Sequence, residues 1–330
     1  MTNPAELGYV GAVAHGGNRV RRISSRLTQP PLRPVSNVVE GPLEQVYPGA
    51  MGGLQDGLDR AIAVIAEHSK DSEFRVQLHP EVVEALTRSG LNRMLLPGEL
   101  GGLEADPREV VDAVARIAAA DSSAGWCAGI SAGCAIFSGH VSQDATGEMY
   151  ADPDVGMAGM FAPLGVVNRH QRGVTGGEGR LSGRWPFASN VLHSRWIGVG
   201  ALVPDDLTSE PTPRVLFVRT ADLTIEDTWH SSGLRATGSH HVRAKDVAID
   251  LARSTTFAGS PWADGPLWQL PLFTVLLPVL VAGPLGTARA AVDVVLERVV
   301  RAGSGAVRGE LADDRRSGTR RPCGHPSCSW

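Results

Sequence analysis

The sequence predicts an α+β protein in which a helical region comes first, a β domain follows, and helices resume. Two changes in the spacing of apolar residues carry this prediction. Apolar residues recur at helical spacing over residues 54–155, and shorter strand-like runs separated by Gly, Pro and Asp fill residues 156–255. A long apolar stretch over residues 266–302 then predicts a last, partial helical domain.

The first region is predicted to contain four helices. The first is indicated by residues at helical spacing, Leu58, Ile62 and Ile65. A second opens at Pro80 and ends at Gly90, and a third opens at Pro107, because proline is favoured in the first turn and glycine beyond the last. The small-residue run from Asp121 to Gly133 predicts a buried helix capped by Asp121 or Ser122.

The β domain is predicted from runs rich in apolar and β-branched residues. These runs are Met157–Phe161, Val166–Asn168, Arg180–Trp185, Trp196–Val203, Arg214–Arg219 and Val242–Ile249. The glycines of residues 176–179 lie between two of them and predict a hairpin turn rather than a phosphate-binding loop. After Pro271 an apolar helix is expected to reach Val299, with a break or kink at Pro278 and Pro284.

Both ends of the chain differ in composition from the middle. Residues 1–53 are rich in Gly, Pro, Arg and Ser and are predicted to be mostly disordered, and residues 303–330 form an atypical Arg- and Gly-rich tail. Cys323, His325 and Cys328 in that tail lack a fourth ligand and match no zinc pattern. We therefore assign no metal site from the sequence.

Composition excludes several classes of function. The 330 residues carry 31 basic and 35 acidic side chains, a net charge of −4, so no basic field favours nucleic acid. We expect no membrane-spanning segment, since no uncharged apolar run approaches the required length, and no secretory signal at the N-terminus. The four cysteines do not form a disulfide framework, which fits a reducing compartment and a cytoplasmic location.

Two segments, residues 183–190 and 227–239, are the most informative. In the first, Trp185, Phe187 and Ser189 place an indole, a phenyl ring and a hydroxyl within five residues of strand-like sequence. Such a group can offer an aromatic wall and a hydrogen bond to one flat heteroaromatic ligand. Composition alone favours a blander interpretation, in which Trp185 is a core tryptophan and Ser189 a turn hydroxyl.

The order of motifs resembles the acyl-CoA dehydrogenase superfamily over roughly residues 54–300. Residues 95–102 look like its proline and double-glycine loop, and residues 119–126 resemble a helix of its two-component flavin-dependent monooxygenase (hydroxylase) branch. Residues 183–190 and 227–239 complete the likeness. The resemblance implies an N-terminal helical domain, a middle β-barrel domain and a C-terminal helical bundle that is incomplete here.

The resemblance also implies a flavin, FMN or FAD, between the β domain and the helices. Trp185 and Phe187 would form a wall for the ring, and Ser189 would donate to its N5 or a nearby atom. The full set of implied cofactor contacts is Trp185, Phe187, Ser189, Phe161, Pro163 and Gly165. On the substrate side we expect Trp126 and His193. The dehydrogenases' usual polar residue is absent from the strand-end loop at residues 161–165, which favours the hydroxylase branch.

No catalytic residue can be assigned from the sequence. The family places its base, a glutamate or a histidine, in C-terminal helices, and only about one and a half helices follow the β domain here. Some hydroxylases carry a further histidine where Gly133 and Cys134 stand. Other histidines, His193, His230, His240 and His241, are expected to be solvated loop or strand-end residues, although we would test His193 first.

The sequence therefore leads to three functional hypotheses. The first is a reduced-flavin monooxygenase acting on an aromatic or polyketide-like small molecule, with a separate flavin reductase and homo-oligomers if the fold is complete. The second is an acyl-CoA dehydrogenase that oxidises the α,β carbons of an acyl thioester. The third is a catalytically incomplete remnant, whose apolar residues 270–300 would be uncovered and promote association.

Overall fold

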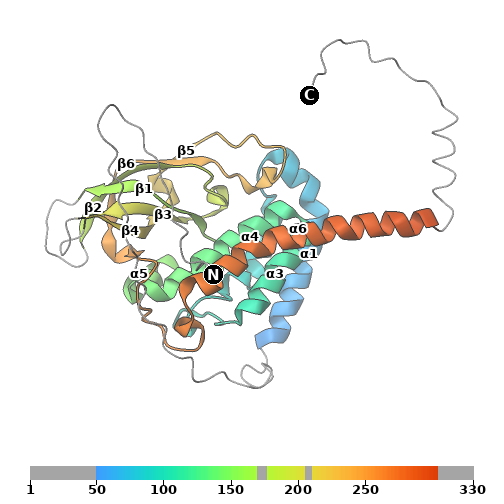
Figure 1. The fold of residues 1–330 in the computed structure, drawn as a ribbon, viewed down its shortest axis with the longest axis horizontal. Helices are drawn as coiled ribbons and strands as arrows, with labels where there is room; N and C mark the ends of the chain where they lie inside the picture. Colours follow the sequence, from blue (N-terminus) through green and yellow to red (C-terminus); the bar gives the residue numbers. More distant parts are fainter. Residues whose placement is uncertain (1–49, 169–176, 205–209, 304–330) are drawn as a thin grey trace, which may run out of the picture. The chain divides into compact units, whose positions relative to one another are not determined.

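The computed structural model describes residues 50–168, 177–204 and 210–303, which form an α+β fold (Figure 1). Three of the sequence predictions fall outside these residues. They are the disorder of residues 1–49, the position of Gly176 in the hairpin, and the tail with Cys323, His325 and Cys328. The predicted boundary at residue 53 is wrong, because the first helix already includes residues 50–53.

Five helices precede the sheet among the described residues. They are α1 (Ala50–Arg75), α2 (Pro80–Arg88), α3 (Pro107–Ala120), α4 (Ser122–Ala135) and α5 (Gln143–Met149). The predicted starts at Pro80 and Pro107 are confirmed. The Asp121 carboxylate caps α4 by accepting the Ala124 N–H at 2.8 Å, which satisfies an amide that lacks a partner in the helix.

Short 3₁₀ helices connect the larger elements. They are η2 (Leu91–Arg93), η3 (Gly98–Leu100), η4 (Ile136–His140), η5 (Val191–His193), η6 (Thr220–Asp222), η7 (Arg235–Thr237), η8 (Leu251–Arg253) and η9 (Leu267–Gln269). Two of them position the residues discussed below: η5 follows residues 183–190, and η7 lies within residues 227–239.

The strands form one mixed sheet. They are β1 (Ala158–Asn168), β2 (Glu178–Trp185), β3 (Trp196–Val203), β4 (Thr212–Arg219), β5 (Thr224–Glu226), β6 (His241–Asp250) and β7 (Ser254–Thr255). Their order is β5-β6-β2-β1-β3-β4-β7, with β1 and β3 parallel and the other neighbours antiparallel. Among the described residues β5 and β7 stay as edges, so the sheet does not close into the barrel that the resemblance implied.

The predicted strands need three changes. The first two predicted runs form the single strand β1, whose pairing with β3 shifts on both sides of Pro163. The short strands β5 and β7 were not predicted, because runs of three and two residues leave no detectable period.

The side chains gather into two apolar cores. Strand β4 shows how they are divided, because Val215 and Phe217 belong to the core of the helical layer while Leu216 and Val218 belong to a core within the sheet. This alternation follows from the two-residue period of a strand. One face of β4 therefore packs toward the helices.

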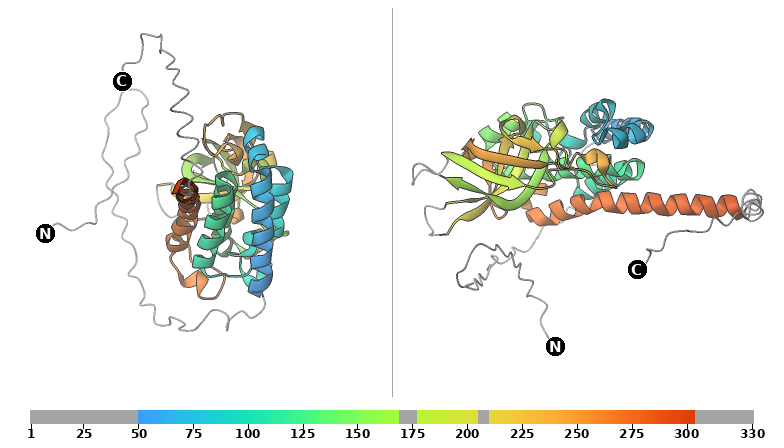
Figure 2. Two further views of the ribbon diagram at one scale, coloured as in Figure 1. Left: turned by 90° about the vertical axis from the view of Figure 1, so that its right-hand side faces the viewer. Right: turned by 90° about the horizontal axis from the view of Figure 1, so that it is seen from above.

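The last helix, α6 (Leu272–Gly303), continues through Pro278 and Pro284, so of the expected break or kink the break is wrong, and the kink stays a prediction. Its first half packs on α3 and α4 through Val275, Val279 and Ala282. Residues 291–300 are all exposed, and this part of α6 extends beyond the other helices (Figures 1 and 2).

One further expectation is corrected by α6. Residues 272–300 are long and apolar enough to cross a membrane by length and composition, and most of this stretch is not buried in the structure. The expectation that no apolar run approaches this length is therefore wrong, although core helices of soluble proteins satisfy the same criteria.

Candidate functional site

The two segments singled out in the sequence, residues 183–190 and 227–239, lie together in the structure. The Ala188 N–H donates to the His240 carbonyl at 2.9 Å, and the Asn190 N–H donates to the Thr237 carbonyl at 3.1 Å. Ser189 also forms an isolated antiparallel bridge with Gly159 of β1. The end of β2, the segment before β6 and the start of β1 therefore meet at Ser189.

Ser189 is the centre of a buried chain of polar groups. The Trp126 indole N–H of α4 donates to the Ser189 hydroxyl at 2.8 Å. Ser189 Oγ lies 2.8 Å from Ser239 Oγ, and Ser239 Oγ lies 2.6 Å from Thr237 Oγ1, which in turn donates to the Leu234 carbonyl at 2.9 Å. The chain links the helical layer to the β domain and brings together two residues that the sequence analysis proposed separately, Trp126 and Ser189.

The direction of this chain follows from counting hydrogens. A hydroxyl has one hydrogen to donate, and the Leu234 carbonyl can only accept, so Thr237 spends its hydrogen there. Ser239 must then donate to Thr237, and Ser189 must donate to Ser239. The Ser189 hydrogen is therefore directed to Ser239, and toward any further partner Ser189 offers a lone pair.

Phe187 and two neighbours form an aromatic surface beside this chain. Phe187 has φ of +61° and a side chain 58% exposed, which is unusual for a large apolar residue. Its ring meets Trp229 edge-on at 6.1 Å and His241 edge-on at 5.6 Å between centroids. The buried His241 Nδ1 has no hydrogen-bond partner. A flat heteroaromatic ligand fits the exposed Phe187 ring.

Trp185 does not contribute to that surface. Its side chain is fully buried in the core of the sheet, and its indole N–H donates to the Gly200 carbonyl at 2.7 Å. A Cβ at Gly165 would lie 2.4 Å from the indole, and one at Gly183 would lie 2.8 Å from it, so both glycines make room for the ring. The expectation that Trp185 walls a cofactor is corrected to the alternative, a core tryptophan, and Gly165 is explained by the same packing.

The strand-end residues Phe161 and Pro163 do not converge on Ser189 either. Phe161 packs against Phe137 at 5.0 Å between centroids and joins the helical core. Pro163 is exposed at the irregular part of β1, where proline's missing N–H is tolerated. Among the described residues, Phe187 and Ser189 are the expected cofactor contacts that lie beside the polar chain.

His193 joins two parts of the structure, and its expected contact with a substrate stays a prediction. Its Nε2 accepts the Leu78 N–H at 3.2 Å, which ties η5 of the β domain to the connection between α1 and α2. Burial lowers the pKa of His193 to about 4, so the ring is neutral at physiological pH. The expectation of a solvated imidazole is therefore wrong for this residue.

His240 was also expected to be solvated, and it is 8% exposed. Its Nδ1 accepts the backbone N–H groups of Thr228 and Trp229 at 3.1 and 3.2 Å, and burial lowers its pKa. A neutral His240 thus holds the segment that carries Trp229 beside Phe187. The sequence held no signal for this role, since it depends on two backbone amides eleven and twelve residues away.

The Arg235 guanidinium is held by two backbone carbonyls. Its Nε donates to the Glu73 carbonyl of α1 at 3.2 Å and its Nη1 to the Ser231 carbonyl at 3.1 Å.

Cys127 and Cys134 are buried in α4, and desolvation raises the pKa of both thiols, so neither is a nucleophile. The described residues around Ser189 thus offer hydrogen bonds and aromatic contact.

The known proteins to which the chain is similar include monooxygenases and hydroxylases. No protein-family model matches the chain. It is 29% identical over 263 residues to an indole-3-acetate monooxygenase of Pseudomonas putida, covering 79% of this chain and 62% of that protein. It is also 29% identical over 270 residues to the oxygenase subunit of the flavin-dependent monooxygenase HsaA of Rhodococcus jostii, covering 78% of this chain and 68% of that protein.

Solved structures give the same result. A 3-HSA hydroxylase from a Rhodococcus species superposes with a TM-score of 0.70 at 26% identity, covering 77% of this chain and 66% of that one. XiaF from a Streptomyces species, solved in complex with FADH2 and glycerol, superposes with a TM-score of 0.67 at 26% identity, covering 75% and 63%. The chain spans less than two thirds of the length of the first of the curated relatives.

Proposed function

We propose that this chain binds a reduced flavin and serves as the oxygenase component of a two-component monooxygenase. It is homologous to oxygenase subunits of flavin-dependent monooxygenases and has their acyl-CoA dehydrogenase-like fold. The chain would receive FMN or FAD, already reduced, from a separate flavin reductase. The bound flavin would supply the activation of dioxygen, while the protein supplies binding, orientation and electrostatics.

The observation that carries this proposal is the direction of the polar chain at Ser189. Because the Ser189 hydrogen is directed to Ser239, the Ser189 oxygen offers a lone pair to a ligand. A reduced flavin carries hydrogen on N5 and can donate to that lone pair, whereas an oxidised flavin presents N5 as an acceptor. The polar chain therefore favours the reduced ring, and the donor role first expected of Ser189 is reversed.

The aromatic surface supplies the rest of the fit. Phe187 would give one apolar contact for the ring, and His241, which packs edge-on against Phe187, would support that side chain. Trp126 would act through Ser189, because its indole N–H holds the hydroxyl oxygen in place. All three residues belong to the described part of the chain.

The substrate we propose is a small aromatic or polyketide-like molecule. The relatives include an indole-3-acetate monooxygenase and a resorcinol hydroxylase, and both of those names contain an aromatic compound. The acyl-CoA dehydrogenase alternative has no comparable support. We also propose that the chain forms homo-oligomers and acts in the cytoplasm.

The test is anaerobic titration of the purified chain with reduced and with oxidised FMN and FAD, followed by quenching of tryptophan fluorescence. We expect reduced flavin to bind at least about tenfold more tightly, a difference of about 1.4 kcal/mol. Ser239→Ala frees the Ser189 hydrogen, so this variant should lose most of the preference by binding oxidised flavin better. Ser260→Ala, at an exposed position, is the matched control.

Two outcomes would count against the proposal. Equal affinity for both redox states in the unaltered chain would refute the role of the polar chain. If soluble, folded chain bound no flavin at all, the remaining hypothesis would be a catalytically incomplete remnant.

A further inference from the structure

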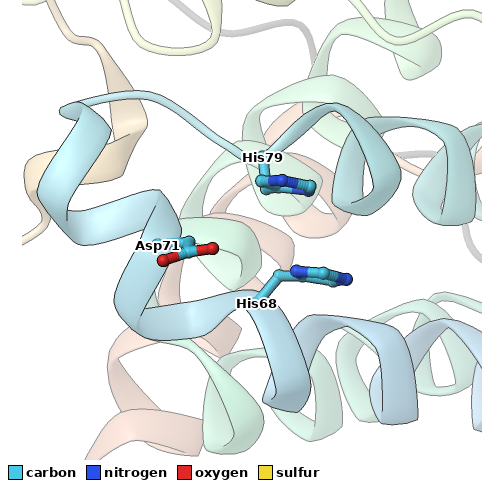
Figure 3. Close-up of side chains that lie close together, drawn as sticks. All are labelled: His68, Asp71 and His79. Carbon is cyan, nitrogen blue, oxygen red and sulfur yellow. The ribbon is translucent and has the colours of Figure 1, made fainter.

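A second cluster of chemically reactive side chains lies away from Ser189, where α1 ends and α2 begins. His68 and Asp71 belong to α1, and His79 is the N-cap residue of α2. One potential ligand atom from each lies within 4.8 Å of the others (Figure 3). The two imidazole rings are stacked, with centroids 4.2 Å apart and planes inclined by 1°.

The backbone holds this cluster in place. His68 and Asp71 are three residues apart and therefore share one face of α1. The His79 N–H donates at 3.0 Å to the hydroxyl of Ser72, which is 1% exposed, so the α1–α2 connection is fixed against α1. The neighbouring residue Leu78 is held by His193 of the β domain. Contacts of Ser72 and Leu78 therefore fix the α1–α2 connection that brings the three side chains together.

We propose that a divalent first-row transition-metal ion, for which Zn²⁺ is the example used below, binds to His68, Asp71 and His79. Glu81 is the fourth ligand. Imidazole and carboxylate are ligands that Zn²⁺ takes in tetrahedral sites. A Glu81 carboxylate oxygen already lies 3.3 Å from His68 Nε2, so an oxygen donor stands beside the stacked rings. This metal site does not depend on the flavin proposal. A bound ion would link the end of α1 to the start of α2.

Coordination requires the imidazole rings to turn, because a ring nitrogen binds a metal in the plane of its ring and the two planes are now parallel. Metal–ligand distances of about 2.1 Å in a tetrahedron put ligand atoms roughly 3.4 Å apart, so atoms now up to 4.8 Å apart must close by about 1.4 Å. Asp71 is exposed and can rotate. His79 Nδ1 accepts the Glu81 N–H in a long hydrogen bond of 3.3 Å, and rotation of the ring would exchange this cap for the metal.

The test uses the full chain without an affinity tag and with Cys323→Ser and Cys328→Ser, so that the thiols of the tail cannot bind metal. Co²⁺ binding is read from its visible absorption, and Zn²⁺ affinity from competition with a chromophoric chelator. We expect one ion per chain and a rise in the melting temperature with Zn²⁺, because a ligand that binds the folded state alone stabilises it.

Variants then locate the ion. His79→Asn retains an N-cap acceptor, so the metal-free protein should keep its melting temperature while Zn²⁺ affinity falls at least about tenfold. His68→Gln should act alike. His230→Asn, a change at an exposed histidine, should bind as the parent does. Unchanged affinity in both His68→Gln and His79→Asn, or no Zn²⁺ binding by the parent, would overturn the proposal.

Discussion

The indole nitrogen of Trp126 donates to the hydroxyl of Ser189 across 2.8 Å, and this bond joins α4 to the segment that follows β2. The sequence suggested a substrate role for the first residue and a cofactor role for the second. Since the two side chains are hydrogen-bonded to each other, the substrate role of Trp126 and the cofactor role of Ser189 would not be independent. A change at Trp126 alters the surroundings of the Ser189 oxygen even though the two residues are 63 positions apart.

Replacing Trp126 with Phe tests this coupling. The ring packing is largely kept and the indole donor is lost, so Ser189 Oγ loses its incoming hydrogen bond. We expect a loss of about 1–2 kcal/mol in the free energy of unfolding, the usual cost of leaving one buried polar group partly unsatisfied. Reduced-flavin affinity should fall as well, because Ser189 is less firmly placed.

The measurement is urea denaturation together with flavin titration. Ser189→Ala serves as the reference, since in its background Trp126→Phe should have little further effect on flavin binding. Additive losses of flavin affinity in the double variant would show that Trp126 acts separately from Ser189.

The helical part was largely predictable from the sequence, and the site was predictable only in part. Pro80, Pro107 and Asp121 mark helix starts through local backbone chemistry that needs no tertiary contact. Residues 183–190 and 227–239 were identified, but Trp185 was misassigned because burial beneath Gly165 and Gly183 depends on strand pairing. His240 escaped prediction because its partners are backbone amides of a distant turn.

Gly286 of α6 marks the closest approach to α3, and we expect Gly286→Ala to destabilise the fold. An added Cβ would lie 2.0 Å from the Ala115 carbonyl oxygen, and a helix backbone cannot move aside as a side chain can. Overpacking of this kind costs about 1–3 kcal/mol. The midpoint of urea denaturation should fall accordingly.

Gly283→Ala on the same helix is the matched control. Apart from its chain neighbours, the nearest atoms to its added Cβ are 3.8 Å away, an ordinary contact. The midpoint should change little, because the better helix propensity of alanine is offset by the contact of its Cβ with the ring of Pro284. If both variants shifted stability in the same direction by similar amounts, the close α3–α6 contact would not be the cause.

The exposed half of α6 carries an apolar stripe, which we define as Leu285, Val292, Val295 and Val299. Each is more than half exposed, and their spacings of seven, three and four residues are those of a coiled-coil seam. Exposed apolar stripes of this kind promote association. We expect the purified chain to self-associate at micromolar concentration, as measured by sedimentation velocity.

A pair of single substitutions separates the stripe from general apolarity. Val295→Glu places a charge on the stripe and should shift the chain toward the monomer. Val294→Glu changes a valine of similar exposure, 50% against 59%, on another face of α6, and should leave association nearly unchanged. Equal effects of the two variants would show that association does not follow the stripe.

His193 predicts a pH dependence of stability whose sign is fixed by its environment. Its pKa falls from an ordinary 6.5 to about 4 in the folded protein because the ring is buried. Between these values the unfolded chain binds the proton and the folded chain does not, so acid favours unfolding. This stabilisation is fully present above pH 6.5 and is lost progressively as the pH falls, and the loss reaches about 3 kcal/mol at pH 4.

His193→Gln isolates this effect, because a glutamine can still accept the Leu78 N–H but does not titrate in this range. The free energy of unfolding, measured by urea denaturation from pH 7.5 to 4, should fall less steeply in the variant than in the parent. His230→Gln alters a histidine whose side chain is 71% exposed and should retain the parent slope. Parallel pH profiles for the parent and His193→Gln would mean that His193 accepts a proton in the folded state without losing its place against Leu78.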